Sequence, residues 1–438
     1  MLLRDHELSV RAALPRPFGF VLRPNIRCGL RHCQGRMQGV VVALKPTGNG
    51  SSARVGTNTD DVRRRNLSTV LTLVHRHRAL TRAELTRHTG LSRSTTKDLV
   101  EQLVAGGLVE ESPAASPSQV GRPSPVVRPG HKVLAAAVTP EVDAVTVGLV
   151  GMGGAVLRVL RCATDRAPTP EDTVAIVAEA LAEIRHTLSD AQSITAVGVA
   201  VPGLVHSRQS AVQLAPNLDW HDAEIGPMLS AATELPVYAA NDANAGAIAE
   251  HLFGNHHSAE HLIYVNGGPS GIGAGFVVAG GLLEGLAGYA GELGHTFVGG
   301  TSECHCGSIG CLETEVTHAP LARLLSQLDS ESSGPTEQSA AEPDRDEREV
   351  LSKQTRALAI ALGNAINMLN PGLIVLGGFL RVFPRYAADA LRAELARHSM
   401  TAPRQLVRIV PATLGADTLM IGAAELAFAP VLADPGRN

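Results

Sequence analysis

The sequence is poor in aromatic residues, which make up 3% of its 438 positions and include a single tryptophan. Hydrophobic residues nevertheless reach 44%, so the core has to be built from Ala, Val, Leu and Ile. Charged residues amount to 18%, a balance typical of globular proteins that excludes a largely disordered chain. A chain of this length has room for two or three domains.

Long apolar runs are also missing from the sequence. No run reaches the roughly 20 apolar residues that a membrane-spanning helix needs, so we expect no membrane partner. Residues 1–57 are rich in arginine but lack an apolar core followed by a small-residue cleavage site, so a secretory signal is not expected. This segment also has no sustained periodicity and predicts a disordered extension. We therefore expect a cytoplasmic protein.

Cysteine is scarce, with six residues, but three of them lie close together at Cys304, Cys306 and Cys311. In a chain without an export signal, such spacing favours a metal over disulfides. With His295 they supply three thiolates and one imidazole, the ligand set of a closed structural zinc site. His305 is a rival ligand between two of the cysteines, and free thiols are the other alternative.

Residues 61–130 contain the signals of three consecutive helices. Leu67 and Val70 belong to an apolar face with helical spacing, and Thr81 with Glu84 has the pattern of a capping box. These signals predict a first helix before residue 78 and a second one after Thr81.

The rest of this segment predicts a third helix and a wing. Gly90 ends the second helix, and Ser92 is a favourable N-cap for the third. Residues 108–111 and 125–128 have the composition of two short strands around a Ser/Pro/Gly-rich loop. Three helices, a tight turn and a two-stranded wing predict a winged helix-turn-helix.

Charge supports operator DNA as the partner of this module. Residues 61–128 hold eleven Lys and Arg against six Asp and Glu, a local net charge of +5 in a chain of net charge -4. Such local basicity attracts a phosphate backbone. The alternative is a protein-interaction module with a solvated basic face. The residues predicted to contact DNA are those at the start of the third helix and one in the wing, namely Arg93, Ser94, Thr95, Thr96, Lys97 and Arg122.

Residues 131–430 alternate strand and helix patterns, which predicts an α/β domain. The segment LAAAVTPEVDAVTVGLVG predicts a β-hairpin, and PVYAANDANAGAIAEHLFG predicts strand, turn and helix. An acidic stretch with few apolar residues, at about 326–349, predicts a mobile loop inserted between helices.

Several of these segments together resemble the ROK family (repressor, open reading frame, kinase), in its transcription-factor branch. The winged-helix segment LTRAELTRHTGLSRSTTKDLVEQLVAGGLVEE is followed in order by GVAVPGLV, APNLDW, NDANAGAIAE, GIGAG, GELGH, CHCGSIGCLE and NPGLIVLGG. Each motif alone is weak, but their combination in this order is specific. The resemblance spans about residues 61 to 428. It implies a two-lobed, actin-like fold of the sugar-kinase type after the winged helix.

The resemblance also implies a sugar site in the cleft between the lobes. Carboxylates and amides suit such a ligand, since neighbouring sugar hydroxyls both donate and accept hydrogen bonds. His295 would serve both sites, with one ring nitrogen on zinc and the other on a hydroxyl. For Asn241 and Asp242, capping of the following helix is the alternative role. The implied sugar-binding residues are Asn217, Asn241, Asp242, Glu292, His295 and Glu313.

The motifs argue against nucleotide chemistry. Kinases of this family have an early Asp-x-Gly-Gly-Thr hairpin, where glycines let backbone amides approach the ATP phosphates. Here Thr139, Pro140 and Glu141 occupy the turn; proline lacks an amide donor and glutamate adds negative charge. Asp242 matches the family's catalytic base, but without a phosphate site it would serve binding. We therefore expect no catalytic residue and no enzyme.

The sequence thus predicts a sugar-responsive DNA-binding regulator, in particular a repressor released from its operator by a sugar. Closure of the cleft would change the spacing of paired winged helices on a palindromic operator, which predicts a homodimer or homotetramer. One alternative is a sugar kinase with a DNA-binding domain. Another is a DNA-binding protein whose cleft docks a protein partner. Free sugars, amino sugars and sugar phosphates stay open as ligands, with the acidic site disfavouring phosphates.

Overall fold

The computed structural model describes residues 59–113, 124–256, 259–268, 271–332 and 342–436. The predicted disordered extension, residues 1–57, lies outside the described part of the chain and stays a prediction.

Three helices form the first part of the described chain. They are α1 (Thr59–His77), α2 (Arg82–Thr89) and α3 (Arg93–Ala105). The expected capping box is present, since Thr81 Oγ1 accepts from the Glu84 amide and the Glu84 carboxylate accepts from the Thr81 amide. Gly90 ends α2 with a φ of 69°, a left-handed conformation that suits glycine. The Ser92 side chain caps α3 by accepting from the Thr95 amide.

A small antiparallel sheet completes this part, in the order β1-β3-β2. Its strands are β1 (Leu80–Thr81), β2 (Val109–Ser112) and β3 (Val126–Pro129). The two predicted wing strands are each shifted by one residue, a normal uncertainty for element ends. Buried Leu71, Leu85, Leu99 and Val127 form a core between the helices and the wing, as in a winged helix-turn-helix.

A five-stranded sheet follows, with the strand order β11-β7-β4-β5-β6. Its strands are β4 (Val133–Pro140), β5 (Ala144–Gly151), β6 (Ala155–Ala163), β7 (Ser193–Val201) and β11 (Val237–Asn241). Strands β4, β7 and β11 run parallel, whereas β4, β5 and β6 form an antiparallel meander. All eight residues of β4 and of β5 are buried, so both faces of the sheet are covered.

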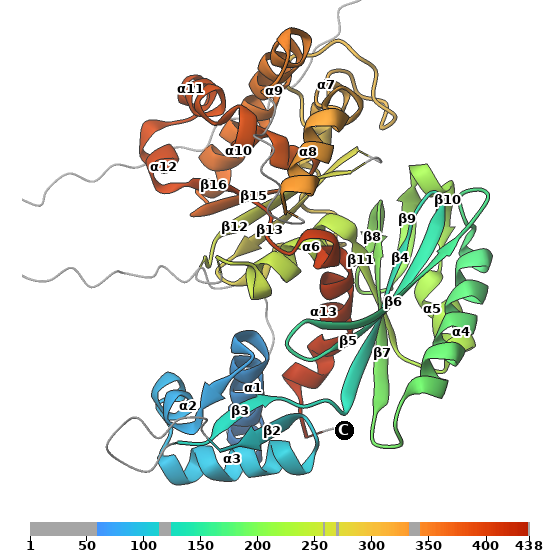
Figure 1. The fold of residues 1–438 in the computed structure, drawn as a ribbon, viewed down its shortest axis with the longest axis vertical. Coiled ribbons are helices and arrows are strands. Elements are labelled where there is room, and N and C mark those ends of the chain that lie inside the picture. Colours follow the sequence, from blue (N-terminus) through green and yellow to red (C-terminus); the bar gives the residue numbers. More distant parts are fainter. Residues whose placement is uncertain (1–58, 114–123, 257–258, 269–270, 333–341, 437–438) are drawn as a thin grey trace, which may run out of the picture. The chain divides into compact units, whose positions relative to one another are not determined.

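Helices cover the two faces of this sheet (Figure 1). One face carries α4 (Pro170–Thr187) and α5 (Ile225–Thr233), and the other carries α13 (Thr418–Ala433). Residues of β4 alternate between them: Leu134 and Ala136 join the core under α4, whereas Ala135 and Ala137 join the core that includes α13. The period of two along a strand produces this alternation.

A second five-stranded sheet has the order β14-β13-β12-β15-β16. Its strands are β12 (Leu262–Gly268), β13 (Gly271–Val278), β14 (Gly281–Leu282), β15 (Leu373–Gly378) and β16 (Arg408–Pro411). Helix α6 (Asp242–Phe253) packs on one face through β12 and β13. Helix α6 also packs against α13, so the two sheets are joined through this pair of helices. The arrangement is the two-lobed α/β architecture that the motifs predict.

The other face of the second sheet carries a larger helical layer. Its main helices are α8 (Ala322–Ser332), α9 (Arg345–Leu369), α10 (Val382–Tyr386) and α11 (Ala388–His398), with α7 (Leu312–Glu315) and α12 (Thr401–Leu406) beside them. A separate sheet of order β10-β9-β8 comprises β8 (Leu204–His206), β9 (Ala211–Ala215) and β10 (Trp220–Ala223). The 3-10 turns are η1 (Pro216–Leu218), η2 (Leu293–His295), η3 (Ala319–Leu321), η4 (Phe379–Arg381) and η5 (Gly415–Asp417).

The predicted mobile loop at about 326–349 is largely wrong in the part that the structure describes. Helix α8 extends to Ser332 and α9 begins at Arg345, and 333–341 lies outside the described residues. The acidic residues of this stretch make the helical start possible. Asp344 and Glu347 form a capping box for α9, and Glu347 also accepts two hydrogen bonds from Arg323. Low hydrophobicity here reflects capping chemistry rather than the absence of structure.

Helix α13 is an exception to the expectation that no segment of the sequence is apolar enough to span a membrane. With the preceding turn, residues 415–433 are long and apolar enough by length and composition alone. The helix is packed inside the protein against β4, β7 and α6, however, and ten of its residues are buried. Its apolar surface on all sides follows from this central position. All of the described residues, including α13, belong to one compact unit spanning 57–438.

Candidate ligand, metal and DNA sites

The start of α3 presents the polar face expected of a DNA-reading helix. Arg93, Ser94 and Lys97 are exposed, and Thr95 is half-buried. Lys97 Nζ lies 3.6 Å from Glu101 Oε1, one turn further along the helix. Such an exposed pair is weak, so the lysine can exchange its partner for a phosphate at little cost.

Thr96 does not belong to this exposed face, and the prediction for this residue is wrong. Its side chain is 1% exposed and lies against α2, where its hydroxyl accepts a hydrogen bond from Thr86 Oγ1 at 3.1 Å. The same hydroxyl donates to the Ser92 carbonyl at 3.0 Å. Thr96 therefore sets the packing of the two helices. Arg122, the wing residue of the prediction, lies outside the described residues.

Part of the local positive charge is engaged within the protein. Arg82 Nη2 donates to Glu111 Oε2 at 2.6 Å, which ties α2 to the wing strand β2. Arg78 Nε donates to the Gly153 carbonyl at 2.8 Å. The local net charge counted from the sequence thus overstates the charge available to DNA, because these two arginines are engaged within the protein.

Asn241 and Asp242 meet at the junction of β11 and α6. Asn241 Oδ1 accepts from the amides of Ala243 and Asn244, at 2.9 and 3.2 Å, and its Nδ2 donates to the Gly203 carbonyl at 3.0 Å. Its amide group therefore performs the capping role that was the alternative for this residue. It also fastens the start of α6 to the turn after β7.

Asp242 is less constrained than its neighbour. Its Oδ1 accepts from the Ala243 amide at 2.8 Å, and within the described part of the chain no side chain donates to its carboxylate. Burial raises the pKa of the Asp242 carboxyl to about 6, with hydrogen bonds from backbone amides acting in the opposite direction. A carboxylate held in place by one oxygen retains the capacity to accept from a ligand hydroxyl.

Glu292 directly precedes the turn η2, and His295 is the last residue of that turn. Desolvation raises the pKa of Glu292, followed by the negative charges of Asp242 and Glu313. The three acids thus interact electrostatically although they come from different parts of the chain. The imidazole of His295 lies between two of these carboxylates. Its Nε2 lies 3.9 Å from Glu292 Oε2, and its Nδ1 lies 3.4 Å from Glu313 Oε1.

Glu313, on α7, points into the cysteine loop, the segment from Cys304 to Cys311. Its side chain is 8% exposed, and Oε1 lies 3.1 Å from His305 Nδ1 and 3.0 Å from Cys304 Sγ. A Cβ atom at Gly271 would lie 2.4 Å from Glu313 Oε2, so this glycine of β13 makes room for the carboxylate. Asn217, by contrast, lies in η1 on a different turn from the acids and is exposed.

The cysteine loop folds tightly around its thiols. Gly307 and Gly310 have φ values of 87° and 72°, and short bridges pair Phe297 with Cys311 and Glu303 with Ile309. The ligand atoms of four residues lie within 4.8 Å of one another, and the set is His295, Cys304, Cys306 and Cys311. A second set of the same compactness replaces the last two cysteines with His305 and Glu313.

The spacing within the first set suits a tetrahedral ion. The sulfurs of Cys306 and Cys311 are 3.7 Å apart, and Cys304 Sγ lies 3.6 Å from His295 Nδ1. An ion about 2.3 Å from two sulfurs in tetrahedral geometry separates them by roughly 3.8 Å. Burial raises the pKa values of Cys304 and Cys311, whereas the Ser308 amide lowers that of Cys306.

The turn between β4 and β5 offers little to a phosphate. Thr139 and Pro140, which were predicted in the turn, are instead the last two residues of β4. Pro140 has no amide hydrogen, and the Glu141 amide is already bonded to the Ala144 carbonyl at 2.8 Å. Arg161 on the neighbouring strand β6 pairs with Asp143 at 2.7 Å. The turn therefore presents carboxylates, and its nearby arginine is engaged with them.

The glycines of strand β13 have a packing role. A Cβ atom at Gly275 would lie 2.6 Å from the Ala243 carbonyl of α6, and one at Gly273 would lie 2.8 Å from the Ala243 side chain. These glycines allow α6 to lie directly on the strand.

Sequence reasoning missed three buried polar residues. Glu250 on α6 accepts from the amides of Thr413 and Leu414, at 2.7 and 3.0 Å. His75 on α1 bonds to Glu425 on α13 at 2.8 Å. Their partners are between 163 and 350 residues away in the sequence. An apolar face that contains one histidine or glutamate is the only local signal, and it is ambiguous.

Comparison with known proteins gives a consistent result. The model of the ROK family matches residues 142–429, and that of the IclR helix-turn-helix domain matches residues 67–113. The xylose repressor of Caldicellulosiruptor bescii is 25% identical over 385 residues, covering 84% of this chain and 96% of that protein. The glucokinase of Thermotoga maritima is 29% identical over 299 residues, covering 64% and 93%.

A solved structure also resembles the chain along most of its length. A ROK family transcriptional regulator, described as a homologue of the E. coli MLC protein, superposes with a TM-score of 0.67 at 24% identity. The match covers 85% of this chain and 97% of that one. At 24% identity it supports the fold alone. The predicted fold class and the predicted family resemblance are both confirmed.

Proposed function

The chain belongs to the ROK family, and on that premise we propose that it is a sugar-responsive DNA-binding transcriptional repressor. The observation that carries this proposal is the combination of two parts in one compact unit. One part exposes the polar start of α3, and the other gathers Asp242 and Glu292 near a glycine-rich strand. The similarity to a xylose repressor, which covers 84% of this chain and 96% of that protein, supports the proposal.

The proposed ligand is a neutral sugar. Asp242 would accept from one or two hydroxyls, and Glu292 and Glu313 would accept from others or orient His295. The three carboxylates would repel a phosphate group, so a free sugar or an acylated amino sugar suits the site better than a sugar phosphate. We include Asn217, Asn241 and His295 in the site as predicted, with Asn241 contributing chiefly through the position of α6.

The proposed DNA contacts are Arg93, Ser94, Thr95 and Lys97 at the start of α3, with Arg122 in the wing. Arginine and lysine would bind phosphates or guanine edges, and the hydroxyls would bind either. A repressor of this kind reads a palindrome, so the proposed active form is a homodimer or homotetramer acting in the cytoplasm.

The experiment begins with a thermal-shift screen of D-xylose, D-glucose and N-acetyl-D-glucosamine. A sugar that binds the folded state raises the Tm. A DNA duplex is then selected from a random pool by the purified protein, and its affinity is measured with and without that sugar. We expect one sugar to raise the Tm and to weaken duplex binding. The proposal fails if no sugar changes either quantity, or if the protein selects no duplex.

A second candidate function is ATP-dependent phosphorylation of the sugar, because a glucokinase is among the relatives. The turn between β4 and β5 argues against it: Pro140 lacks an amide donor and Glu141 adds a carboxylate. We therefore propose that the chain has no kinase activity and that Asp242 binds the sugar without acting as a base. An assay of ADP release with ATP, magnesium and each sugar decides the matter, and sugar-dependent ADP release would establish the kinase.

We further propose that the cysteine loop holds a structural Zn²⁺ through His295, Cys304, Cys306 and Cys311. Zinc prefers thiolates to the carboxylate and second imidazole of the rival set. Burial favours neutral thiols at Cys304 and Cys311, and a bound divalent cation supplies the positive charge that stabilises their thiolates. When bound, the ion would hold the loop that carries Glu313 near His295. Metal analysis of the purified protein should give about one zinc per chain; a folded, sugar-binding sample without metal would refute this.

A further inference from the structure

A buried polar contact joins the winged helix to the sugar-binding part. His75, near the end of α1, is 1% exposed, and its Nε2 lies 2.8 Å from Glu425 Oε2 on α13. Its other nitrogen, Nδ1, accepts from the Gly153 amide at 2.9 Å. Both sides of the imidazole are therefore used by residues of the other part, one on a helix and one on the β5–β6 turn.

The hydrogen bonds define the protonation state of this contact. Because Nδ1 accepts from an amide, the ring proton lies on Nε2 and is donated to Glu425. Glu425 Oε1 is buried and has no hydrogen-bond partner among the described residues. A buried carboxylate with one of two oxygens satisfied adds little to stability, since the cost of desolvation offsets the attraction. What such a bond does provide is direction, which apolar packing lacks.

The rings around His75 extend the contact to helix α6. His75 meets the edge of Phe253 at a centroid distance of 5.3 Å, and Arg78 lies over the same ring at 5.1 Å. Phe253 is the last residue of α6, and Asp242 is the first. A helix of this length spans about 17 Å. One rigid element therefore has the sugar-site carboxylate at one end and the α1 contact at the other.

Helices α6 and α13 are constrained to move together. A Cβ atom at Gly422 of α13 would lie 2.1 Å from the Ala245 carbonyl of α6, so the two backbones are in direct contact. Glu250 of α6 accepts from the amides of Thr413 and Leu414, just before α13 begins. A displacement of the Asp242 end of α6 is therefore carried to Glu425 as well as to Phe253, because close-packed helices transmit strain.

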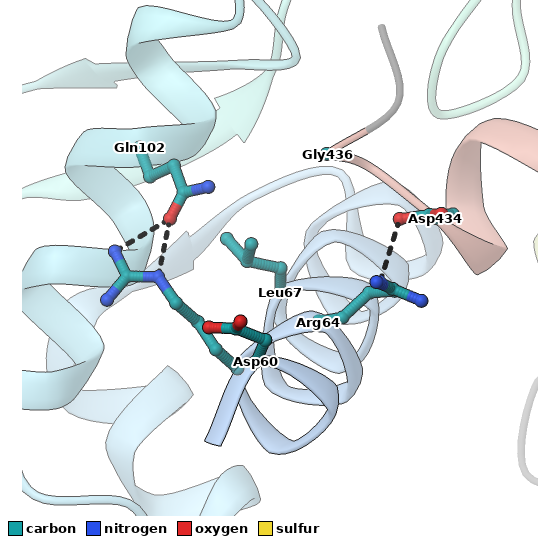
Figure 2. Close-up of a pocket in the computed structure, with 7 residues that line it drawn as sticks. Asp60, Arg64, Leu67, Gln102, Asp434 and Gly436 are labelled. Atoms are coloured by element: carbon teal, nitrogen blue, oxygen red, sulfur yellow. Dashed lines mark hydrogen bonds and ion pairs between the residues drawn. The ribbon is translucent and has the colours of Figure 1, made fainter. Parts of the chain in front are cut away.

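Beside the contact at His75, the interface has both an apolar core, to which Val74 and Phe428 belong, and open space. A cavity of about 610 Å³ separates wing residues such as Glu110 and Arg128 from Gly151 and Leu157 of the β5–β6 hairpin. A second cavity, of about 480 Å³, lies between α1, α3 and residues 434–436 (Figure 2). Exposed Arg64 is among its lining residues and lies 3.6 Å from Asp434. The winged helix thus has space on two sides of the contact at His75.

We infer that His75 is a positioning residue through which the α6–α13 pair sets the orientation of the DNA-reading helices. The inference rests on the proposed sugar response and specifies which residues would transmit it to α1. A shift of α6 on sugar binding moves Phe253 and Glu425, the imidazole follows its hydrogen bonds, and α1 pivots into the space that the two cavities provide.

The test replaces the directional contact by an apolar one in the full-length chain, with the double variant His75→Phe/Glu425→Leu. Replacing both partners leaves no buried charge, so this variant is expected to fold. The matched control is Arg64→Gln, which removes an exposed ion pair between the same two parts. Three quantities are measured: affinity for the sugar that raises the wild-type Tm in the screen, affinity for the selected duplex with and without it, and hydrogen exchange of peptides covering 75–78 and 151–154.

For the wild type and the control, we expect sugar to change duplex affinity by a typical allosteric factor, about 5- to 150-fold. The double variant should bind sugar as tightly as the wild type but change duplex affinity less than about twofold, below that range. Sugar should alter exchange of both peptides in the wild type and in the control, but not in the double variant. If the double variant keeps the wild-type ratio of duplex affinities with and without sugar, this inference is wrong while the proposed function stands. The same holds if the wild type responds to sugar without altered exchange at 151–154. A wild type that responds to no sugar overturns the proposed function itself.

Discussion

His75 and His295 use the same pair of chemical groups, an imidazole and a glutamate, in opposite surroundings. The His75 side chain is 1% exposed, and its partners are one carboxylate and one amide. The His295 side chain is 28% exposed and faces Glu292, Glu313 and Cys304. Burial and the number of partners separate the two roles: the open site has groups to offer to an ion and a ligand, whereas the sealed one can only fix an orientation.

The two sites also differ in the number of carboxylates and in what compensates their charge. Near His295, desolvation and the negative charges of Asp242 and Glu313 raise the pKa of Glu292, and a cation or ligand hydroxyls would offset this repulsion. At His75, the single buried carboxylate of Glu425 depends on one donor. Removing a component should therefore change composition and affinity at the first site but stability and coupling at the second.

The largest effect is expected for Cys304→Ser, which removes one thiolate of the open site. Loss of a ligand should lower zinc affinity by about 100-fold or more and weaken sugar binding with it, because the loop that carries Glu313 loses its support. Zinc content after dialysis and sugar affinity by calorimetry measure the two effects. Cys162→Ser, which lies outside the cluster, is the control, and equal zinc content in both variants would contradict the assignment.

At the sealed site, His75→Phe alone should lower the free energy of unfolding by about 3–5 kcal/mol, since it leaves Glu425 buried without a donor. Adding Glu425→Leu should restore most of this loss. Urea denaturation of the single and double variants measures both changes. If the single variant is as stable as the wild type, Glu425 must reach water or another partner in solution, and the contrast with His295 disappears.

Asp242→Asn should weaken sugar binding by about 10- to 100-fold, the usual worth of hydrogen bonds to a charged acceptor. Its binding to the selected duplex without sugar should be unchanged, because Asp242 lies at the end of α6 remote from α1. Calorimetry and gel shift give the two affinities. A variant that loses duplex binding as well would show that Asp242 supports the fold of the winged helix rather than the ligand.

The smallest expected effect is on pH dependence. The pKa of Asp242 is raised to about 6, so its carboxyl takes up a proton as the pH falls below that value. A hydroxyl donor needs the ionised form, and sugar affinity should fall about tenfold between pH 7 and pH 5. The same raised pKa means that this group's contribution to stability decreases as the pH rises from about 4 to 6. A slope unchanged in Asp242→Asn would assign the titration to another residue.

Local chemistry made much of the site predictable. The capping box at Thr81 and Glu84, the cap at Ser92 and the close spacing of Cys304, Cys306 and Cys311 depend on neighbours in sequence, so short motifs predict them. Thr96 shows the limit of this reasoning. Its place on the buried or exposed face of α3 depends on where α2 packs, and a helix start rich in Ser and Thr does not reveal that.

The prediction of a mobile loop near residues 326–349 was largely wrong for a related reason. Composition predicted a loop, but Asp344 and Glu347 cap α9, and Arg323 from α8 neutralises Glu347. Charged residues at helix ends have the same composition as charged residues in a loop, and only their hydrogen bonds distinguish them.

The sequence by itself determined the α/β architecture, the family, the winged helix and the identity of the cysteine loop, because each is written in adjacent residues and in their order. Tertiary structure alone decided that Glu313 faces the cysteine loop, that the glycines of β13 accommodate α6, and that His75 meets Glu425 across 350 residues of chain. The physical reason is the same in all three cases. Contacts between remote segments depend on packing of the whole fold, and a buried polar group acquires its role from the partner that packing provides.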